Sequence, residues 1–156
     1  MGRRRYQADG FIPITDPPAR RHLDADTDTF VKGDAIHDDG SGYATNAATD
    51  FAATFKGICA ASYNNSGGSQ GGVKVEIYPF DFKTQYIVPV ASTTLITQGA
   101  IGTFVDLENN DDIDLTDTLT EGVVFKIDDI DVSAEAVAAN AYGYAIGHFE
   151  VIGTQT

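Results

Sequence analysis

Apolar and polar residues alternate over several short stretches of the chain, which is the pattern of β-strands with one buried and one exposed face. Residues 73–77 alternate valine and isoleucine with lysine and glutamate, and residues 86–90 show a similar period. The alternation returns over 123–127 and then resumes out of phase at 130–132. These stretches predict half-buried strands, with a β-bulge near residues 128–129.

Further apolar runs extend this β pattern to both ends of the chain. They lie at 30–36, 55–61, 103–107 and 142–152, and a glycine-rich, hairpin-like loop occupies 64–72. Many short strands joined by glycine-rich turns are typical of small all-β folds. We therefore predict a mainly β fold, a small antiparallel β-barrel or sandwich with one short helix and an extended N-terminal arm. The sequence shows no repeat of fixed period.

The short helix is predicted from apolar residues that recur at intervals of three and four after residue 44. They are Ala44, Ala47, Ala48, Phe51, Ala52 and Phe55. Thr45 or Asn46 is available as the N-cap. The alanine-rich segment 133–140 fits either a short helix or a loop.

The two ends of the chain differ in charge. All five arginines lie in the first 21 residues, which carry only two acidic residues and a net charge of +3. They are Arg3, Arg4, Arg5, Arg20 and Arg21. The remaining residues hold five lysines against 21 acids, or −16, so that the whole chain carries −13. An acidic body repels phosphates, and we expect no nucleic-acid partner. The composition also fits a protein exposed to high salt.

Residues 1–28 are predicted to form an extended basic arm and linker, and residues 29–156 the β-rich domain. Pro13, Pro17 and Pro18 favour an extended course for the arm. We interpret its five arginines as a partner-binding strap that docks on an acidic surface of a neighbouring subunit or of a partner. The alternative is a disordered terminus whose charge aids solubility.

The sequence contains no recognisable catalytic constellation. His22, His37 and His148 lie in no setting typical of a general base, and Cys59 lies in an apolar run that indicates a buried thiol. Phosphate-binding loops, dinucleotide fingerprints and zinc-protease motifs do not occur. We predict that the protein is not an enzyme and uses no cofactor or metal.

An acidic run at residues 108–117 places oxygen-bearing side chains at alternate positions, as a calcium loop does. It lacks the turn glycine and the distal glutamate of an EF-hand. We interpret it as a solvated, turn-forming loop, with calcium binding as the alternative.

The beginning of the sequence lacks the apolar stretch of a secretory signal, and no run is long enough to cross a membrane as a helix. We expect synthesis in the cytoplasm and no membrane partner.

Six short segments follow one another in a familiar order between residues 30 and 152. They are Phe-Val-Lys-Gly-Asp-Ala-Ile at 30–36, Phe-Lys-Gly-Ile-Cys-Ala at 55–60, the alternating strand at 73–77, Asp-Leu-Glu-Asn-Asn-Asp-Asp-Ile at 106–113, Gly-Val-Val at 122–124 and Ile-Gly-His-Phe-Glu-Val at 146–151. In this order the segments resemble the head decoration (cement, capsid-stabilising) proteins of tailed bacteriophages and related viruses.

The resemblance implies a small β-rich protein without an active site, commonly a homotrimer. Such proteins add to the outside of a mature icosahedral capsid and stabilise it by bridging major capsid subunits, which implies a virion location. Many copies on a repeating lattice gain affinity through multivalency. Binding to the mature lattice alone would stabilise that state by mass action.

A second hypothesis is a carbohydrate- or receptor-binding β-module of a virion fibre or cell surface. Its stacking faces would come from the tyrosines, although the chain has no tryptophan. These are Tyr6, Tyr43, Tyr63, Tyr78, Tyr86, Tyr142 and Tyr144. A third class, a hydrolase or isomerase on a small barrel, is disfavoured by the failed search for catalytic residues.

Overall fold

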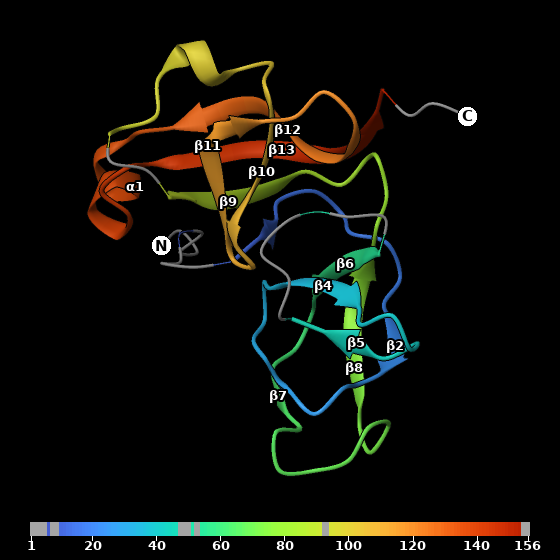
Figure 1. The fold of residues 1–156 in the computed structure, drawn as a ribbon. Helices are drawn as coiled ribbons and strands as arrows, with labels where there is room; N and C mark the ends of the chain where they lie inside the picture. The colour runs from blue at the N-terminus through green and yellow to red at the C-terminus, as the bar shows by residue number, and fades with distance from the viewer. Residues whose placement is uncertain (1–5, 7–9, 47–50, 52–53, 92–93, 154–156) are drawn as a thin grey trace.

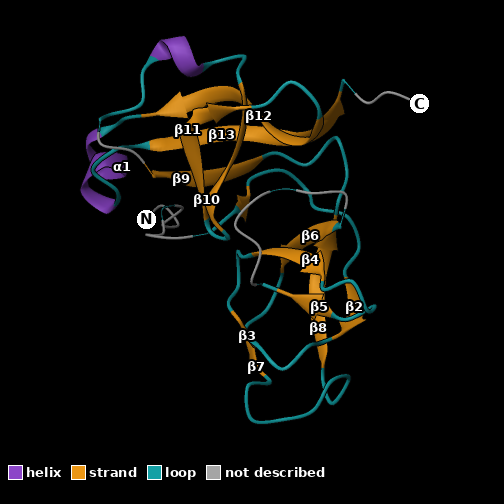
Figure 2. Cartoon of the chain, in the orientation of Figure 1, coloured by secondary structure: helices purple, strands orange, loops and turns teal. Residues whose placement is uncertain are grey.

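The computed structural model describes residues 6, 10–46, 51, 54–91 and 94–153, and it confirms a mainly β fold with one short α-helix (Figure 2). In chain order the elements are β1 (Ile12–Pro13), β2 (Arg21–Asp24), β3 (Thr29–Phe30), β4 (Ala35–Asp38), β5 (Ala44–Thr45), β6 (Phe55–Cys59), β7 (Tyr63–Asn64), β8 (Lys74–Pro79), β9 (Tyr86–Ala91), the 3-10 turn η1 (Gln98–Ala100), β10 (Phe104–Asn109), β11 (Asp112–Thr118), β12 (Gly122–Asp131), α1 (Ala134–Ala139) and β13 (Tyr144–Ile152).

The second half of the chain closes a ring of five strands, here called the C-terminal barrel. Neighbours around the ring are β9, β11, β10, β12 and β13, and β13 pairs again with β9. Strand direction cannot alternate all the way around a ring with an odd number of strands, so one pair must be parallel. That pair is β9 with β11, where Val90 lies opposite Ile113. Strand β1 adds to β9 from outside the ring.

The first half forms a second ring, the N-terminal barrel, which lies beside the first (Figure 1). Its sheet runs β2, β8, β6, β4, β5, with antiparallel neighbours throughout. An isolated parallel bridge between Ala25 and Ala44 brings β5 back beside the end of β2. A ring of five strands again needs one parallel contact, and this bridge supplies it. The small β3–β7 ladder completes this half.

The two barrels have the same strand order and the same register. In each, the first strand meets the third in parallel, and the order continues through the second, fourth and fifth strands. Four cross-strand pairs of the N-terminal barrel each have an equivalent in the C-terminal barrel. His37–Thr45 matches Asp106–Asp114, Ile36–Gly57 matches Val105–Phe125, Ile58–Tyr78 matches Lys126–His148, and Leu23–Val75 matches Val88–Ala145. The chain is therefore a tandem pair of one five-stranded fold.

The turns that begin the second strand of each barrel also match. The N–H of Gly33 donates to the carbonyl of Cys59 at 2.9 Å, and the N–H of Gly102 donates to the carbonyl of Ile127 at 2.7 Å. Both glycines have a positive φ, a conformation that favours glycine. Apart from such glycines few equivalent residues are identical, which explains why the sequence shows no repeat.

Each barrel has its own apolar interior, built from equivalent positions. Ala25 and Val90, Ala44 and Ile113, and Cys59 and Ile127 are buried pairs that share one place in the fold. The N-terminal member is the smaller residue in each pair. At other equivalent positions the order is reversed, because Ile36 and Val75 take the places of Val105 and Ala145.

Phe149 joins the two barrels. Its ring lies against six other aromatic rings, with centroids 4.9–6.0 Å apart. These are Phe11, Phe51, Phe55, Phe80, Tyr86 and Phe125. Phe149 belongs to β13 of the C-terminal barrel, whereas Phe55 begins β6 of the N-terminal barrel. The largest hydrophobic cluster therefore crosses the junction, and Phe149 is 1% exposed at its centre.

Several sequence predictions can be compared with these elements. The predicted bulge is confirmed, because the β12–β13 register shifts between Ile127 and Asp129. The helix predicted from residue 44 is wrong at both ends. Ala44 and Thr45 form β5, and Phe55 begins β6. Positions 47, 48 and 52 lie outside the described residues, and Phe51 is assigned to no helix.

The helical spacing at 44–55 is misleading because its apolar side chains serve two different cores. Ala44 fills the N-terminal barrel, and Phe51 and Phe55 join the cluster around Phe149. The helix that the structure does contain, α1, lies instead in the alanine-rich segment 133–140, for which the sequence fitted either a helix or a loop. Ser133 caps it by accepting a hydrogen bond from the Ala136 N–H at 3.3 Å.

The predicted arm is part of the fold from residue 10 onward. Phe11 is 1% exposed and contacts four aromatic rings. The segment that was interpreted as a linker supplies β2, the first strand of the N-terminal barrel. The boundary placed at residues 28 and 29 falls inside that barrel, because the isolated acidic residues before it masked the strand pattern.

Replacing Phe149 by alanine is expected to lower the free energy of unfolding by about 3–5 kcal/mol, since it empties the centre of the junction. Val151→Thr on the same strand is the control, because Val151 is 43% exposed and threonine keeps the β-branched shape. It should change stability by less than about 0.5 kcal/mol. Urea unfolding measures both, and equal losses in the two variants would contradict the central role of Phe149.

Candidate partner-binding surface

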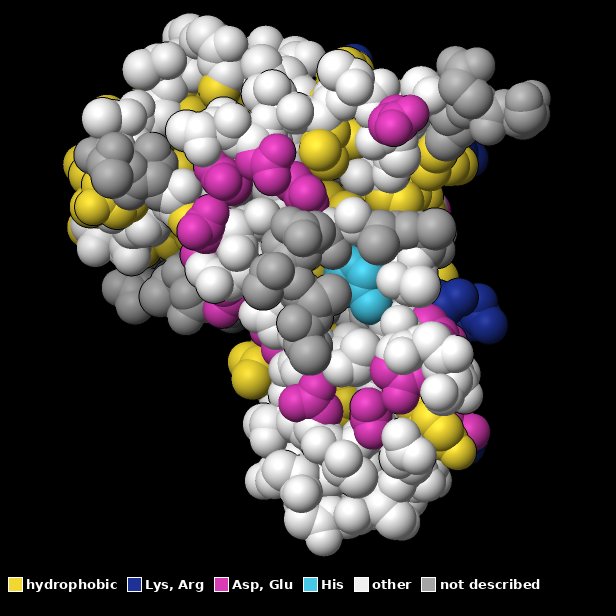
Figure 3. All heavy atoms as spheres, in the orientation of Figure 1, with side chains coloured by type: hydrophobic (Ala, Val, Ile, Leu, Met, Phe, Trp, Pro, Cys, Tyr) yellow, Lys and Arg dark blue, Asp and Glu magenta, His cyan; other side chains and the backbone are white. Residues whose placement is uncertain are grey.

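The five arginines predicted to bind a partner are only partly placed. Arg3, Arg4 and Arg5 lie outside the described residues. Arg20 and Arg21 lie at the start of β2, on the outer side of the N-terminal barrel. Lys and Arg side chains are visible beside this barrel at the edge of the view in Figure 3.

Arg20 is bound within its own chain. Its guanidinium donates to Glu76 at 3.1 Å and to the Tyr78 hydroxyl at 3.4 Å, and it lies over the Tyr78 ring, 5.5 Å from the centroid. The hydrogen bond to Tyr78 and the charge of Glu76 raise its pKa further above an already high value. Arg20 therefore remains positively charged and held in place, with its side chain 47% exposed.

A row of charged side chains continues from Arg20 across the outer face of β2 and β8. The His22 ring lies 3.0 Å from Glu76, and Lys74 pairs with Asp24 at 2.6 Å. Arg21 is exposed. The sequence pattern revealed the arginines of this surface but not Glu76, Tyr78 or Lys74, which reach it through the β2–β8 pairing.

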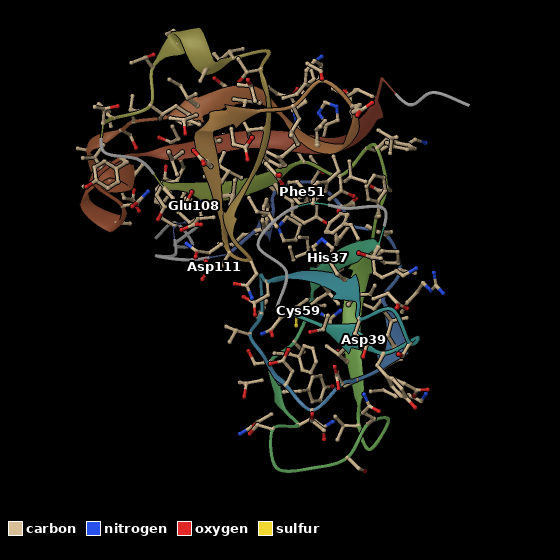
Figure 4. The ribbon with its side chains drawn as sticks, viewed as in Figure 1. His37, Asp39, Phe51, Cys59, Glu108 and Asp111 are labelled. Carbon is tan, nitrogen blue, oxygen red and sulfur yellow. The ribbon has the colours of Figure 1, made fainter. Side chains whose placement is uncertain are left out.

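The acidic run 108–117 lies mostly in two paired strands instead of a solvated loop. It forms the end of β10 and most of β11, joined by a tight turn in which Asp112 accepts a hydrogen bond from the Asn109 N–H at 2.9 Å. Ile113 drives this arrangement, because it is fully buried. Glu108 and Asp111 mark this side of the C-terminal barrel in Figure 4, where acidic side chains also gather in Figure 3.

Two carboxyl groups of this hairpin influence each other. A hydrogen bond with Asp114 raises the pKa of Glu108, and the Thr116 hydroxyl chiefly lowers the pKa of Asp114. Glu108 is thus the group that holds a proton more readily. Within the described residues there is no group of three or more His, Cys, Asp or Glu side chains placed to hold a metal ion.

The three histidines lie in unrelated places. His22 belongs to the charged row, and His37 is buried against Phe55, with ring centroids 5.4 Å apart. The His148 ring lies between two carboxylates, 2.6 Å from Asp128 and 2.6 Å from Glu150. No two of them come together.

Cys59 is a buried thiol, as its apolar surroundings predict. It is 1% exposed, and burial raises its pKa to about 11. Its Sγ donates to the Ala61 carbonyl at 3.0 Å. A thiol in this state is neutral at physiological pH and a poor nucleophile.

Two buried carboxylates were missed by sequence reasoning. Asp106 accepts a hydrogen bond from the Phe51 N–H at 2.7 Å, and Asp34 accepts from the Val31 N–H at 3.1 Å and from the Asn46 side chain at 3.2 Å. Both satisfy backbone donors close to the junction, so their role is structural. No sequence motif marks them beyond their nearness to turns.

The tyrosines do not form one stacking surface. Tyr78, Tyr86 and Tyr144 are buried, and the Tyr6 ring packs on Tyr144 at 5.2 Å. The exposed ones are Tyr63 and Tyr142, which belong to different barrels.

Comparison with known proteins identifies no relative: no family model, no curated protein and no solved structure matches this chain. Among the described residues, none of the helices has the length and apolar character needed to cross a membrane.

The His148 cluster predicts a pH-dependent stability. Burial lowers the pKa of His148, but hydrogen bonds to Asp128 and Glu150 outweigh it and raise the pKa above 6.5. The stabilisation is therefore complete below the unfolded pKa and is lost as pH rises through the folded pKa. Two other polar side chains lie near this cluster. Lys126, opposite His148, places its ammonium group over the Phe104 ring, and the uncharged Gln85 side chain donates a hydrogen bond to Asp128.

Urea unfolding of the natural chain and of His148→Gln between pH 6 and pH 9 measures this effect. The natural chain should be the more stable at pH 6, and the difference should shrink towards pH 9. The variant controls for the repulsion among the other acidic groups, which both proteins share. A difference that stays constant or grows with pH would count against the charged cluster.

Proposed function

We propose that this protein is a structural module that binds the outer surface of a mature icosahedral capsid and stabilises it by bridging major capsid subunits. On this proposal it functions on the virion exterior, as a homotrimer. One observation carries it. Four of the six segments that resemble head decoration proteins, 30–36, 55–60, 106–113 and 146–151, meet at the junction between the two barrels.

Three contacts show how these segments meet. The Ala35 N–H donates to the Asn110 carbonyl at 2.7 Å, which joins segment 30–36 to segment 106–113. The Cys59 N–H donates to the Asp34 carbonyl at 2.8 Å. The rings of Phe55 and Phe149 lie 4.9 Å apart and join segment 55–60 to segment 146–151. The resemblance therefore rests on residues that determine the fold, which supports a structural role.

The surface charges are compatible with such a role. The basic residues Arg20 and Arg21 lie on one barrel, while the acidic β10–β11 hairpin belongs to the other. Two surfaces of opposite sign on one small protein can contact two different neighbours on a lattice, where weak contacts add through multivalency. The scattered tyrosines give the carbohydrate-binding alternative no such support.

Co-sedimentation tests the proposal directly. Shells assembled from the major capsid protein encoded nearest to this chain, in precursor and mature form, are mixed with the purified protein. We expect retention on mature shells at a fixed ratio to the capsid subunit and a rise in shell melting temperature. Retention on neither form would contradict the proposal, and selective binding to a glycan array would favour the carbohydrate-binding module.

The contribution of the N-terminal arginines needs a variant that leaves the fold intact. Deleting residues 1–21 would also remove Phe11 and β1, so substitution is the better test. Replacing Arg3, Arg4 and Arg5 together by glutamine should weaken shell binding by about tenfold or more at low salt. The matched control replaces Lys32, Lys56 and Lys83 by glutamine. Equal binding by the two triple variants would refute a specific role for the arm.

A further inference from the structure

The tandem arrangement reveals a position that is filled in one barrel and open in the other. In the C-terminal barrel, the first strand β9 pairs with β13 on one side and with β1 on the other. Ile87 lies opposite both Ile146 and Ile12, and Tyr86 lies opposite both Gly147 and Pro13. An added strand thus covers this half of β9.

The same position in the N-terminal barrel is the outer edge of β2. By the matching register, His22 and Arg21 occupy the places of Ile87 and Tyr86, because they lie opposite Glu76 and Ile77. Strand β2 ends the order of its sheet, so no further strand is paired with it in the described part of the chain. The backbone groups of such an edge are a template for another strand.

The side chains around the two positions differ in character. In the C-terminal barrel, Ile87, Tyr144 and Ile146 form a small apolar cluster that Ile12, Tyr6 and the α1 residue Ala136 cover. The equivalent residues of the N-terminal barrel are His22, Lys74 and Glu76, which lie in the charged row. An apolar cover does not fit there.

The charge at the open edge points to the nature of its partner. On the outer face of β2 and β8, Arg20 pairs with Glu76 and Lys74 pairs with Asp24, and the His22 ring also contacts Glu76. Arg21 lies opposite Ile77, is exposed, and belongs to none of these three pairs. This edge therefore carries a net positive charge in a chain whose net charge is −13.

We infer that the outer edge of β2, at Arg21 and His22, accepts an extended acidic segment of a partner protein as an additional antiparallel strand, as β9 accepts β1. Backbone hydrogen bonds hold the segment, and the arginines select its acidic side chains. The acceptor edge is a property of the N-terminal barrel and does not depend on the capsid proposal.

A synthetic peptide tests the edge. The probe is an end-capped eight-residue peptide that alternates aspartate and valine, titrated by calorimetry and by amide NMR. We expect binding that perturbs and protects the backbone amides of His22 and Asp24, whose N–H groups point away from β8. A lysine–valine peptide should bind at least about tenfold more weakly. An aspartate–proline peptide keeps the charge but cannot form a ladder, and it should not protect these amides.

Two charge reversals locate the binding site. Arg21→Glu should weaken binding of the aspartate–valine peptide by about tenfold. Lys83→Glu makes the same change of charge at an exposed residue on the connection between β8 and β9, and it should have little effect. Circular dichroism of both variants verifies that the fold is retained.

Four outcomes would overturn the inference. They are absence of binding at millimolar peptide, equal binding of the aspartate–proline peptide, equal losses in the two variants, and amide changes confined to other strands. Sedimentation tests the competing occupant, because self-association that Arg21→Glu abolishes would assign the edge to a second copy of the chain.

Discussion

The structure depends on one aromatic side chain that two separate barrels share. Each ring of five strands is small, and the buried cluster of the N-terminal ring holds aliphatic residues, Cys59 and a single aromatic ring, that of Phe30. A small domain buries a smaller fraction of its surface than a larger one, so two barrels that share a core are more stable than two alone. Phe149 supplies that shared core, because rings from both halves of the chain and from the N-terminal segment surround it.

The close packing around Phe149 also requires glycine at positions that have no room for a side chain. A side chain at Gly147 would collide with the Lys126 carbonyl and with the Phe125 ring, which lies over this glycine. Gly57 stands in a comparable crowded place, where a Cβ atom would meet the Tyr78 carbonyl. Glycine in these strands lets the backbones and rings approach closely enough to close the barrels.

Period-two patterns in the sequence predicted the strands well, because strands such as those of Val75 and Phe125 bury the side chains of one face and expose more of the other. The helix from Ala44 and the free arm were not predictable in this way. Ala44 and Phe55 fit a helical spacing although each serves a different core, and Phe11 gives no local sign that it fills the junction. The duplication was hidden because positions such as Cys59 and Ile127 share only burial and register.

The candidate surface was predictable only in part for a related reason. Arginines are visible in a sequence, but the partners of Arg20 come from β8, far along the chain, and only pairing brings them together. A tandem fold helps here, since one barrel shows how the other could be completed. The chain covers the outer cluster around Ile87 with its own N-terminal residues. It leaves the corresponding charged row around His22 at a sheet edge, where polar side chains need no apolar cover and a strand from outside can still pair.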